Sequence, residues 1–151
     1  MNQPMSVLTS VRSVEWFTPP EIVQTVRATF STGEIALDPA SCDGAQAIVC
    51  AGLAYGPGLE VADGLRSDLK WIAPTLFLNP PFDSCPRWAV RWLTESNLGH
   101  FREGILLVNA SLGYRWFEGL WRKFPCVFLR ERVAFVNGAT GKAGGFPPAK
   151  T

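Results

Sequence analysis

The chain contains Leu76-Phe77-Leu78-Asn79-Pro80-Pro81-Phe82, an apolar run followed at once by two prolines. The run predicts a buried strand, because short apolar stretches bounded by turn residues are typical of strands inside a sheet. The prolines end that strand, since neither can donate a ladder hydrogen bond. The result is a stiff turn with an amide, backbone carbonyls and an aromatic ring at a strand's carboxyl end, where ligands bind in open α/β sheets.

This turn suits chemistry on a planar amino group attached to a heterocycle, whose lone pair is delocalised into the ring. The Asn79 side-chain oxygen and the Pro80 carbonyl are acceptors for its two hydrogens, and Phe82 is placed to stack on the ring during attack on an electrophilic methyl. The alternative is a rigid turn without chemistry, because Asn-Pro alone is a common turn signal. Asn-Pro-Pro-aromatic is expected by chance in roughly one such chain in several hundred, which favours the functional interpretation.

Length and composition predict a single soluble domain over residues 14–151, preceded by a flexible lead-in over residues 1–13. The 151 residues are 47% hydrophobic and 18% charged, which is typical of a globular protein rather than a disordered one. No apolar run approaches the roughly 20 residues of a membrane span. The lead-in lacks the layout of a signal peptide, so we expect a cytoplasmic protein.

The cysteine and histidine pattern predicts no metal site. The four cysteines form no CxxC pair, and His100 is the single histidine. We therefore expect reduced, partly buried thiols.

Charge is divided unevenly along the chain. Residues 1–75 carry four basic and eight acidic side chains, whereas residues 76–151 carry ten basic and five acidic ones. Aromatic residues such as Trp116 and Trp121 are interleaved with the basic ones. This pattern fits a nucleic-acid-binding face and fits an ordinary solvated surface equally well.

The segment Glu15 to Glu21 predicts the start of a helix that runs to about Phe30. Thr18 and Glu21 have the spacing of a capping box, and Pro19 occupies the first helical position. The free amides at such a helix start are able to bind a carboxylate. A capped amphipathic helix without a ligand explains the segment equally well.

Two acidic residues are predicted to follow strands. Ile35 to Leu37 reads as a strand that ends at Asp38, and Val61-Ala62 precedes Asp63 some 25 residues later. If these are successive parallel strands, the two acids line one cleft. Taken singly, Asp38 is explained by an Asp-Pro turn and Asp63 by an exposed loop. No GxGxxG is present, so a dinucleotide site is unsupported.

The second half of the chain predicts helices, strands and one hairpin. A helix from Pro86 is expected to place Trp88, Ala89, Trp92 and Leu93 on one face, with the tryptophans in the core. A later helix is expected to contain Tyr114, Phe117, Leu120 and Trp121. Strands are expected over residues 104–108, 126–129 and 132–136. Asn137-Gly138 then predicts a hairpin turn, but we expect no returning strand after it, and hence a truncated C-terminus.

Taken together, these segments resemble the phage-type DNA N6-adenine methyltransferases, the Dam-like enzymes of phages and prophages. The matching segments occur in family order over residues 15–148 and are Glu15-Trp16-Phe17-Thr18-Pro19, Leu37-Asp38-Pro39-Ala40-Ser41, Asp63-Gly64-Leu65 with Trp71, Leu78-Asn79-Pro80-Pro81-Phe82, Trp88 with Val90, Arg115-Trp116-Phe117 and Arg132-Val133-Ala134-Phe135.

The resemblance implies an α/β, Rossmann-like methyltransferase sheet with flanking helices that binds S-adenosylmethionine and DNA. It implies a catalytic turn for a flipped adenine at Asn79, Pro80, Pro81 and Phe82. It implies cofactor contacts from Trp16, Phe17, Thr18, Pro19, Asp38, Pro39, Ala40, Ser41, Asp63 and Gly64. It implies nucleic-acid contacts from Arg115, Trp116 and Arg132.

Two features depart from the family, and they leave alternatives open. The turn Asn109-Ala110-Ser111 lacks the family's proline, and the family continues past Phe146-Pro147 into a final strand that this sequence lacks. One alternative is a methyltransferase acting on cytosine N4, an RNA adenine or a protein glutamine. The other is an inactive module that binds S-adenosylmethionine or nucleic acid.

Overall fold

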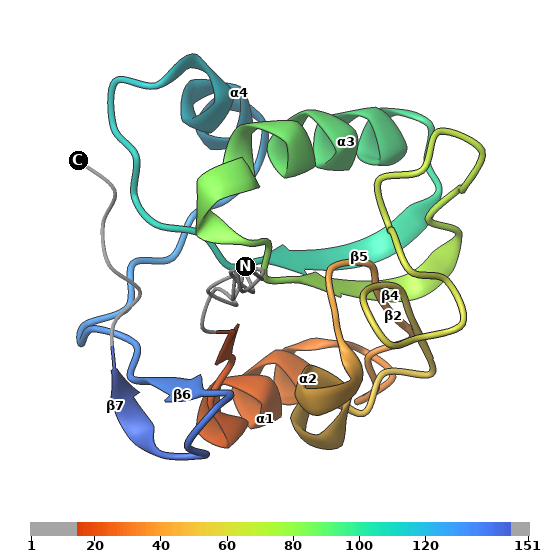
Figure 1. Cartoon of the computed structure of the whole chain (residues 1–151). Coiled ribbons are helices and arrows are strands. Elements are labelled where there is room, and N and C mark those ends of the chain that lie inside the picture. Colours follow the sequence, from red (N-terminus) through yellow and green to blue (C-terminus); the bar gives the residue numbers. More distant parts are fainter. Residues whose placement is uncertain (1–14, 146–151) are drawn as a thin grey trace, which may run out of the picture.

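The computed structural model describes residues 15–145 and has a parallel sheet between two layers of helices (Figure 1). The sheet contains β2 (Leu37–Asp38), β3 (Leu53–Ala54), β4 (Ala73–Leu78) and β5 (Phe101–Leu106). All neighbouring pairs are parallel, in the order β3-β2-β4-β5. The predicted α/β class is therefore confirmed, and the arrangement is compatible with a Rossmann-like fold.

Two helices cover each face of the sheet. Figure 1 shows α1 (Pro20–Thr29) and α2 (Asp43–Val49) on one side, and α3 (Cys85–Asn97) and α4 (Arg115–Lys123) on the other. A short 3-10 turn, η1 (Phe82–Ser84), connects β4 to α3.

Strand β4 is the centre of the core because residues on both of its faces are buried. Leu76 and Leu78 pack into the cluster under α3 and α4, whereas Phe77 joins the cluster under α1 and α2. This alternation follows from the two-residue period of a strand. The fully buried Thr75 hydroxyl links β4 to the segment before β2, since it donates to Glu34 O (2.7 Å) and accepts from Ala36 N (3.0 Å).

Helix α1 buries one face, as expected of an amphipathic helix, and the face predicted for α3 is buried except for Leu93, which is half-buried. Val23, Val26 and Phe30 are buried under α1, and α3 buries Trp88, Ala89 and Trp92. The predicted capping box is wrong, because α1 begins at Pro20, Pro19 is its N-cap and no side chain caps it.

Helix α4 buries only part of the large apolar residues of its segment. Phe117 and Leu120 are buried, but Tyr114 and Trp121 are exposed. Their spacing fits a helical stripe, but only the Phe117 and Leu120 side of this short helix lies in the core.

A second, antiparallel sheet corrects the prediction for the C-terminal hairpin. Strands β1 (Trp16–Phe17), β6 (Phe135–Asn137) and β7 (Ala143–Gly145) pair in the order β1-β6-β7. The returning strand that we expected to be missing is therefore present as β7. The lead-in over residues 1–13 and the family's strand after Pro147 lie outside the described residues.

Four strand predictions fail or shift. Residues 126–129 form no strand, and β6 begins at Phe135 rather than at Arg132. Val61 forms only an isolated bridge with Tyr55, so Asp63 follows a loop and not a full strand. The strand expected over residues 104–108 begins earlier, at Phe101. An apolar run becomes a strand only where a neighbouring strand lies within hydrogen-bonding reach.

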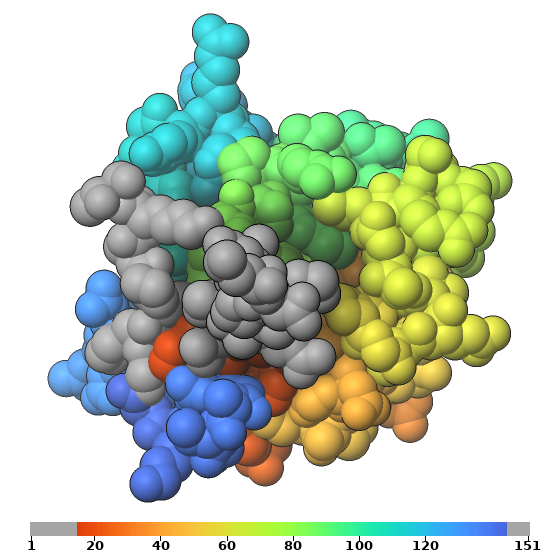
Figure 2. Space-filling model, viewed as in Figure 1, coloured from red at the N-terminus to blue at the C-terminus, as the bar shows by residue number. Residues whose placement is uncertain are grey.

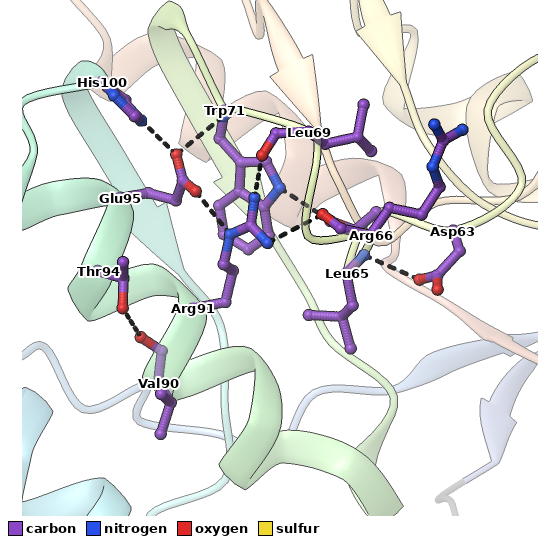
Figure 3. Close-up of polar contacts among 11 residues, drawn as sticks. Asp63, Leu65, Arg66, Leu69, Trp71, Val90, Arg91, Thr94, Glu95 and His100 are labelled. Carbon is purple, nitrogen blue, oxygen red and sulfur yellow. Dashed lines mark hydrogen bonds and ion pairs between the residues drawn. The ribbon is translucent and has the colours of Figure 1, made fainter.

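A buried carboxylate on α3 anchors the segment that precedes β4 (Figure 3). Glu95 contacts Arg91 Nε at 2.6 Å, Trp71 N at 2.9 Å and His100 Nδ1 at 2.5 Å. Burial raises the pKa of Glu95, but the hydrogen bonds from His100, Trp71 and Arg91 outweigh burial and hold that pKa below its usual value. Glu95 is therefore a charged acceptor at neutral pH.

Arg91 extends this anchor along the chain. Its guanidinium donates to Arg66 O at 3.1 Å and to Leu69 O, and lies 5.4 Å from the centre of the Trp71 ring. Trp71 Nε1 in turn donates to Gly64 O at 3.0 Å. One ion pair on α3 thus fixes the whole segment from Gly64 to Trp71.

No helix in the described part of the chain is long and apolar enough to cross a membrane. Among residues 15–145, no group of three or more His, Cys, Asp or Glu side chains is arranged to hold a metal ion. The four cysteines are free thiols; Cys85 is buried, Cys42 half-buried, and Cys50 and Cys126 are exposed.

We predict that Glu95→Ala lowers the free energy of unfolding by about 3–5 kcal/mol, because it leaves Arg91 without its charge partner in a largely buried place. Urea denaturation at neutral pH measures the change. The control is Glu118→Ala, which breaks the exposed Arg122 pair of the same spacing and is expected to cost about 0.5 kcal/mol or less. Equal losses in the two variants would contradict the anchoring role of Glu95.

Candidate active site

The strand order creates a reversal point between β2 and β4. From β2 the chain moves outward to β3, then returns to β4 on the opposite side of β2. Leu37 pairs with Leu76, so the segments that follow the two strands leave the sheet side by side. In open α/β sheets, the crevice at such a point is where ligands bind.

Asn79, the first residue after β4, is oriented by the segment before α1. Its Nδ2 donates to the buried Thr18 Oγ1 at 2.9 Å. Its Oδ1 is also buried and has no hydrogen-bond partner in the described structure. A buried acceptor without a partner costs about 1–3 kcal/mol, so such an atom calls for an explanation.

The two prolines and Phe82 have different environments. Pro80 is fully buried, Pro81 is exposed, and Phe82 is half-buried. The Phe82 ring meets the Phe135 ring of β6 edge-on, with 5.4 Å between ring centres. The small antiparallel sheet therefore reaches the predicted catalytic turn.

A cavity of about 200 Å³ lies beside this turn. It brings together residues from five separate stretches of the chain: Pro39, Ala40, Ser41, Tyr55, Gly56, Pro57, Ala62, Asp63, Gly64, Pro81 and Trp88. Five of the predicted cofactor residues and one of the predicted catalytic residues thus line a single hollow.

Close backbone packing shapes the cavity walls. A Cβ on Gly64 would lie 1.9 Å from Pro39 O, and one on Gly56 would lie 1.7 Å from Ser41 O. Both positions therefore require glycine. The Ser41 Oγ at this wall is buried and, among the described residues, has no hydrogen-bond partner.

Asp38 lies beneath the cavity rather than in its lining. Ala40 N donates to Asp38 Oδ1 at 3.2 Å, which is the geometry of an Asp-Pro turn. Burial raises the pKa of Asp38 to about 7. The Ala40 amide and the Ser41 hydroxyl act in the opposite direction and lower this pKa, although the hydroxyl lies outside normal hydrogen-bond geometry. The turn explanation accounts for this contact, and Asp38 is not among the residues that line the cavity.

The predicted residues before α1 do not line the cavity either. Trp16 and Phe17 form β1, and the Phe17 ring lies against α2, where a Cβ on Gly44 would be 2.6 Å from its Cζ. Pro19 is the buried N-cap of α1. From this segment, Thr18 Oγ1 accepts a hydrogen bond from Asn79 in the predicted catalytic turn.

Five lining residues were not predicted to contribute to a site: Tyr55, Gly56, Pro57, Ala62 and Trp88. Trp88 was assigned to the core, and it both packs against Trp71, with ring centres 6.0 Å apart, and lines the cavity. Tyr55 directly follows β3, and its place after a parallel strand is the signal that would have identified it.

The predicted nucleic-acid residues lie apart from the cavity. Arg115 is the exposed first residue of α4, and Trp116 is half-buried, with its ring 5.7 Å from that of Phe117. Arg132 lies exposed on the segment between α4 and β6. That segment continues into Phe135, and hence to the Phe82 ring.

Comparisons with models of protein families, with curated proteins and with solved structures find no match to this chain. The chemistry of the site therefore follows from its own residues and their geometry.

We predict that wild-type stability falls by on the order of 1 kcal/mol per pH unit as the pH rises from about 5 to about 7. The raised pKa of Asp38 means that the folded chain keeps a proton that the unfolded chain releases near its ordinary pKa. The stabilisation is thus complete at low pH and lost toward neutral pH. Asp38→Asn is expected to remove this decline in urea denaturation.

The matched control is Asp68→Asn, which removes an exposed carboxylate whose pKa the hydrogen bond from Arg66 lowers. Its stability profile above pH 5 is expected to follow that of the wild type. A decline that persists in Asp38→Asn would show that another group causes it.

Proposed function

We propose that the protein is an S-adenosylmethionine-dependent DNA methyltransferase that transfers a methyl group to adenine N6. The observation that carries the proposal is the buried Asn79 Oδ1 without a partner, next to a cavity at the reversal point of the sheet. The resemblance of the ordered sequence segments to phage-type DNA N6-adenine methyltransferases supports the same assignment.

The cavity residues fit part of such a cofactor. Tyr55 and Trp88 offer aromatic surface, Ser41 Oγ is a buried polar atom without a partner, and Asp63 adds a carboxylate at the rim. The volume of about 200 Å³ is below the range of about 300–1,000 Å³ typical of ligand pockets, so the cavity would hold only part of the molecule. When bound, S-adenosylmethionine supplies a sulfonium methyl group.

Asn79 would act by accepting a hydrogen bond from the amino group of the base. The bond from Nδ2 to Thr18 fixes the rotation of the amide and so orients Oδ1 in advance. Because Oδ1 is buried, the surrounding turn must open before the base reaches it. Accepting this hydrogen favours the tetrahedral form of N6, in which the lone pair is available. Bound S-adenosylmethionine would supply the methyl group to this nitrogen, which would lose one of its two protons in exchange.

The rest of the turn would hold the base in place. Pro80 and Pro81 stiffen the backbone that carries the second acceptor, the Pro80 carbonyl. Phe82, braced by the Phe135 ring, would stack on the adenine. The adenine must leave the duplex to reach this turn, because its N6 is obstructed inside the base stack.

We predict that Asn79→Ala lowers methyl transfer to unmethylated DNA by at least about 100-fold, the usual effect of removing one preorganised hydrogen-bonding group. Binding of S-adenosylmethionine, measured by calorimetry, is expected to stay near the wild-type value, because Asn79 is not among the cavity-lining residues. The control Asn97→Ala changes an exposed asparagine at the far end of α3 and is expected to keep full activity. Near-normal turnover in Asn79→Ala would refute the role of the amide.

Nucleoside mass spectrometry of DNA incubated with the wild-type protein and labelled S-adenosylmethionine identifies the acceptor. N6-methyladenine supports the proposal, whereas N4-methylcytosine assigns the same turn to the other base. Cofactor binding without transfer to any DNA would replace the proposal with an inactive binding module.

A further inference from the structure

The segment that joins α4 to β6 exposes an apolar tripeptide. Val127, Phe128 and Leu129 have exposed fractions of 85%, 60% and 47%. They belong to no helix or strand. Three consecutive exposed apolar side chains are unusual on a soluble surface and mark a surface for binding.

The tripeptide is braced on α4 by a series of aromatic contacts. The Phe128 ring lies 5.8 Å from that of Trp121, which lies 6.5 Å from the buried Phe117. The exposed ring is thus connected to the core. In the space-filling view, the cyan atoms around residues 110–118, at the start of α4, project beyond the surrounding surface (Figure 2).

The charges around the tripeptide favour a polyanionic partner. Arg130 and Arg132 follow it directly, with Glu131 between them. From Leu112 to Arg132 the chain carries five basic and two acidic side chains. Guanidinium groups beside exposed aromatic rings are the combination that binds phosphates and bases together.

The tripeptide is also tied to the proposed catalytic turn. The segment that carries it ends in β6, where Phe135 meets the Phe82 ring at 5.4 Å. In Figure 1 this segment passes beside the edge of the sheet at which β4 and β5 end. A duplex bound at the turn would therefore extend over the tripeptide.

We propose that Val127, Phe128 and Leu129 form a wedge that enters the DNA base stack next to the target adenine, with Arg130 on the adjacent phosphate. This inference rests on the proposed function, because it assumes DNA as the substrate. Apolar side chains that enter a base step offset part of the cost of unstacking. The wedge fills the gap that the flipped base leaves, and thereby lengthens the time that the adenine spends at Asn79.

DNA is the occupant that these residues favour over a second copy of the chain. A self-complementary interface would bring the arginines at positions 115, 130 and 132 of both copies close together, and like charges in contact oppose association. DNA, by contrast, supplies the phosphates that these side chains bind.

The test measures binding of the full-length protein to a fluorescein-labelled DNA duplex of random sequence by anisotropy, and separately its methylation of unmethylated genomic DNA. We expect Phe128→Ala to weaken DNA binding by about 10-fold or more, the effect of losing one stacked base. Phe128→Tyr is expected to keep wild-type affinity because it keeps the ring. Arg130→Gln is expected to reduce the slope of log affinity against log salt by about one.

The matched control is Ile72→Ser, which changes an exposed apolar side chain just before β4, at the opposite edge of the sheet. It is expected to leave DNA affinity unchanged. Binding of S-adenosylmethionine is expected to be unchanged in every variant, because none of these residues lines the cavity. Urea denaturation checks that Phe128→Ala folds as stably as the wild type.

The outcomes separate this inference from the proposed function. Suppose that the wild type methylates DNA and that Phe128→Ala binds and methylates DNA equally well. The wedge is then overturned while the proposed function stands. If the wild type binds DNA without methylating it and Phe128→Ala loses that binding, the surface stands and the function fails. A wild type that binds no DNA overturns both. A wild-type dimer that Phe128→Ala converts to a monomer, with DNA affinity unchanged, assigns the surface to a second copy.

Discussion

The Thr75 hydroxyl is completely buried between β4 and the segment before β2, where it uses both its donor and its acceptor capacity. It donates to Glu34 O and accepts from Ala36 N, so β2 cannot slide along β4 without leaving polar groups unpaired in the core. This register brings the turn that begins at Asp38 and the turn that begins at Asn79 to the same edge of the sheet. Everything proposed for the site depends on that alignment.

The wall of the cavity that contains Gly64 is held in place by side chains of α3. Glu95 and Arg91 on α3 fix the segment from Gly64 to Trp71, and Gly64 in turn packs directly on Pro39. The rigid helix thus determines the position of a loop that has almost no regular structure of its own. Placing a site on loops held by packed elements is the common solution for binding sites in α/β proteins.

The site combines unused hydrogen-bonding capacity with tight packing. Asn79 Oδ1 and Ser41 Oγ are both buried without partners among the described residues, as is Trp92 Nε1 in the core under α3. Groups of this kind reduce stability, and they are typical of positions where a ligand supplies the missing partner. Ser41 lines the hollow, and Asn79 lies two residues before the lining residue Pro81, so both groups belong to this edge of the sheet.

The sequence by itself determined the local elements: the strand that ends at Leu78, the proline turn after it, and the buried faces of α1 and α3. These follow from proline chemistry and apolar periodicity, which act within a few residues. Tertiary structure decided the rest. Thr18 faces Asn79 instead of capping a helix, residues 126–129 remain outside any sheet, and β7 pairs with β6, because each of these outcomes depends on which distant segment lies within hydrogen-bonding reach.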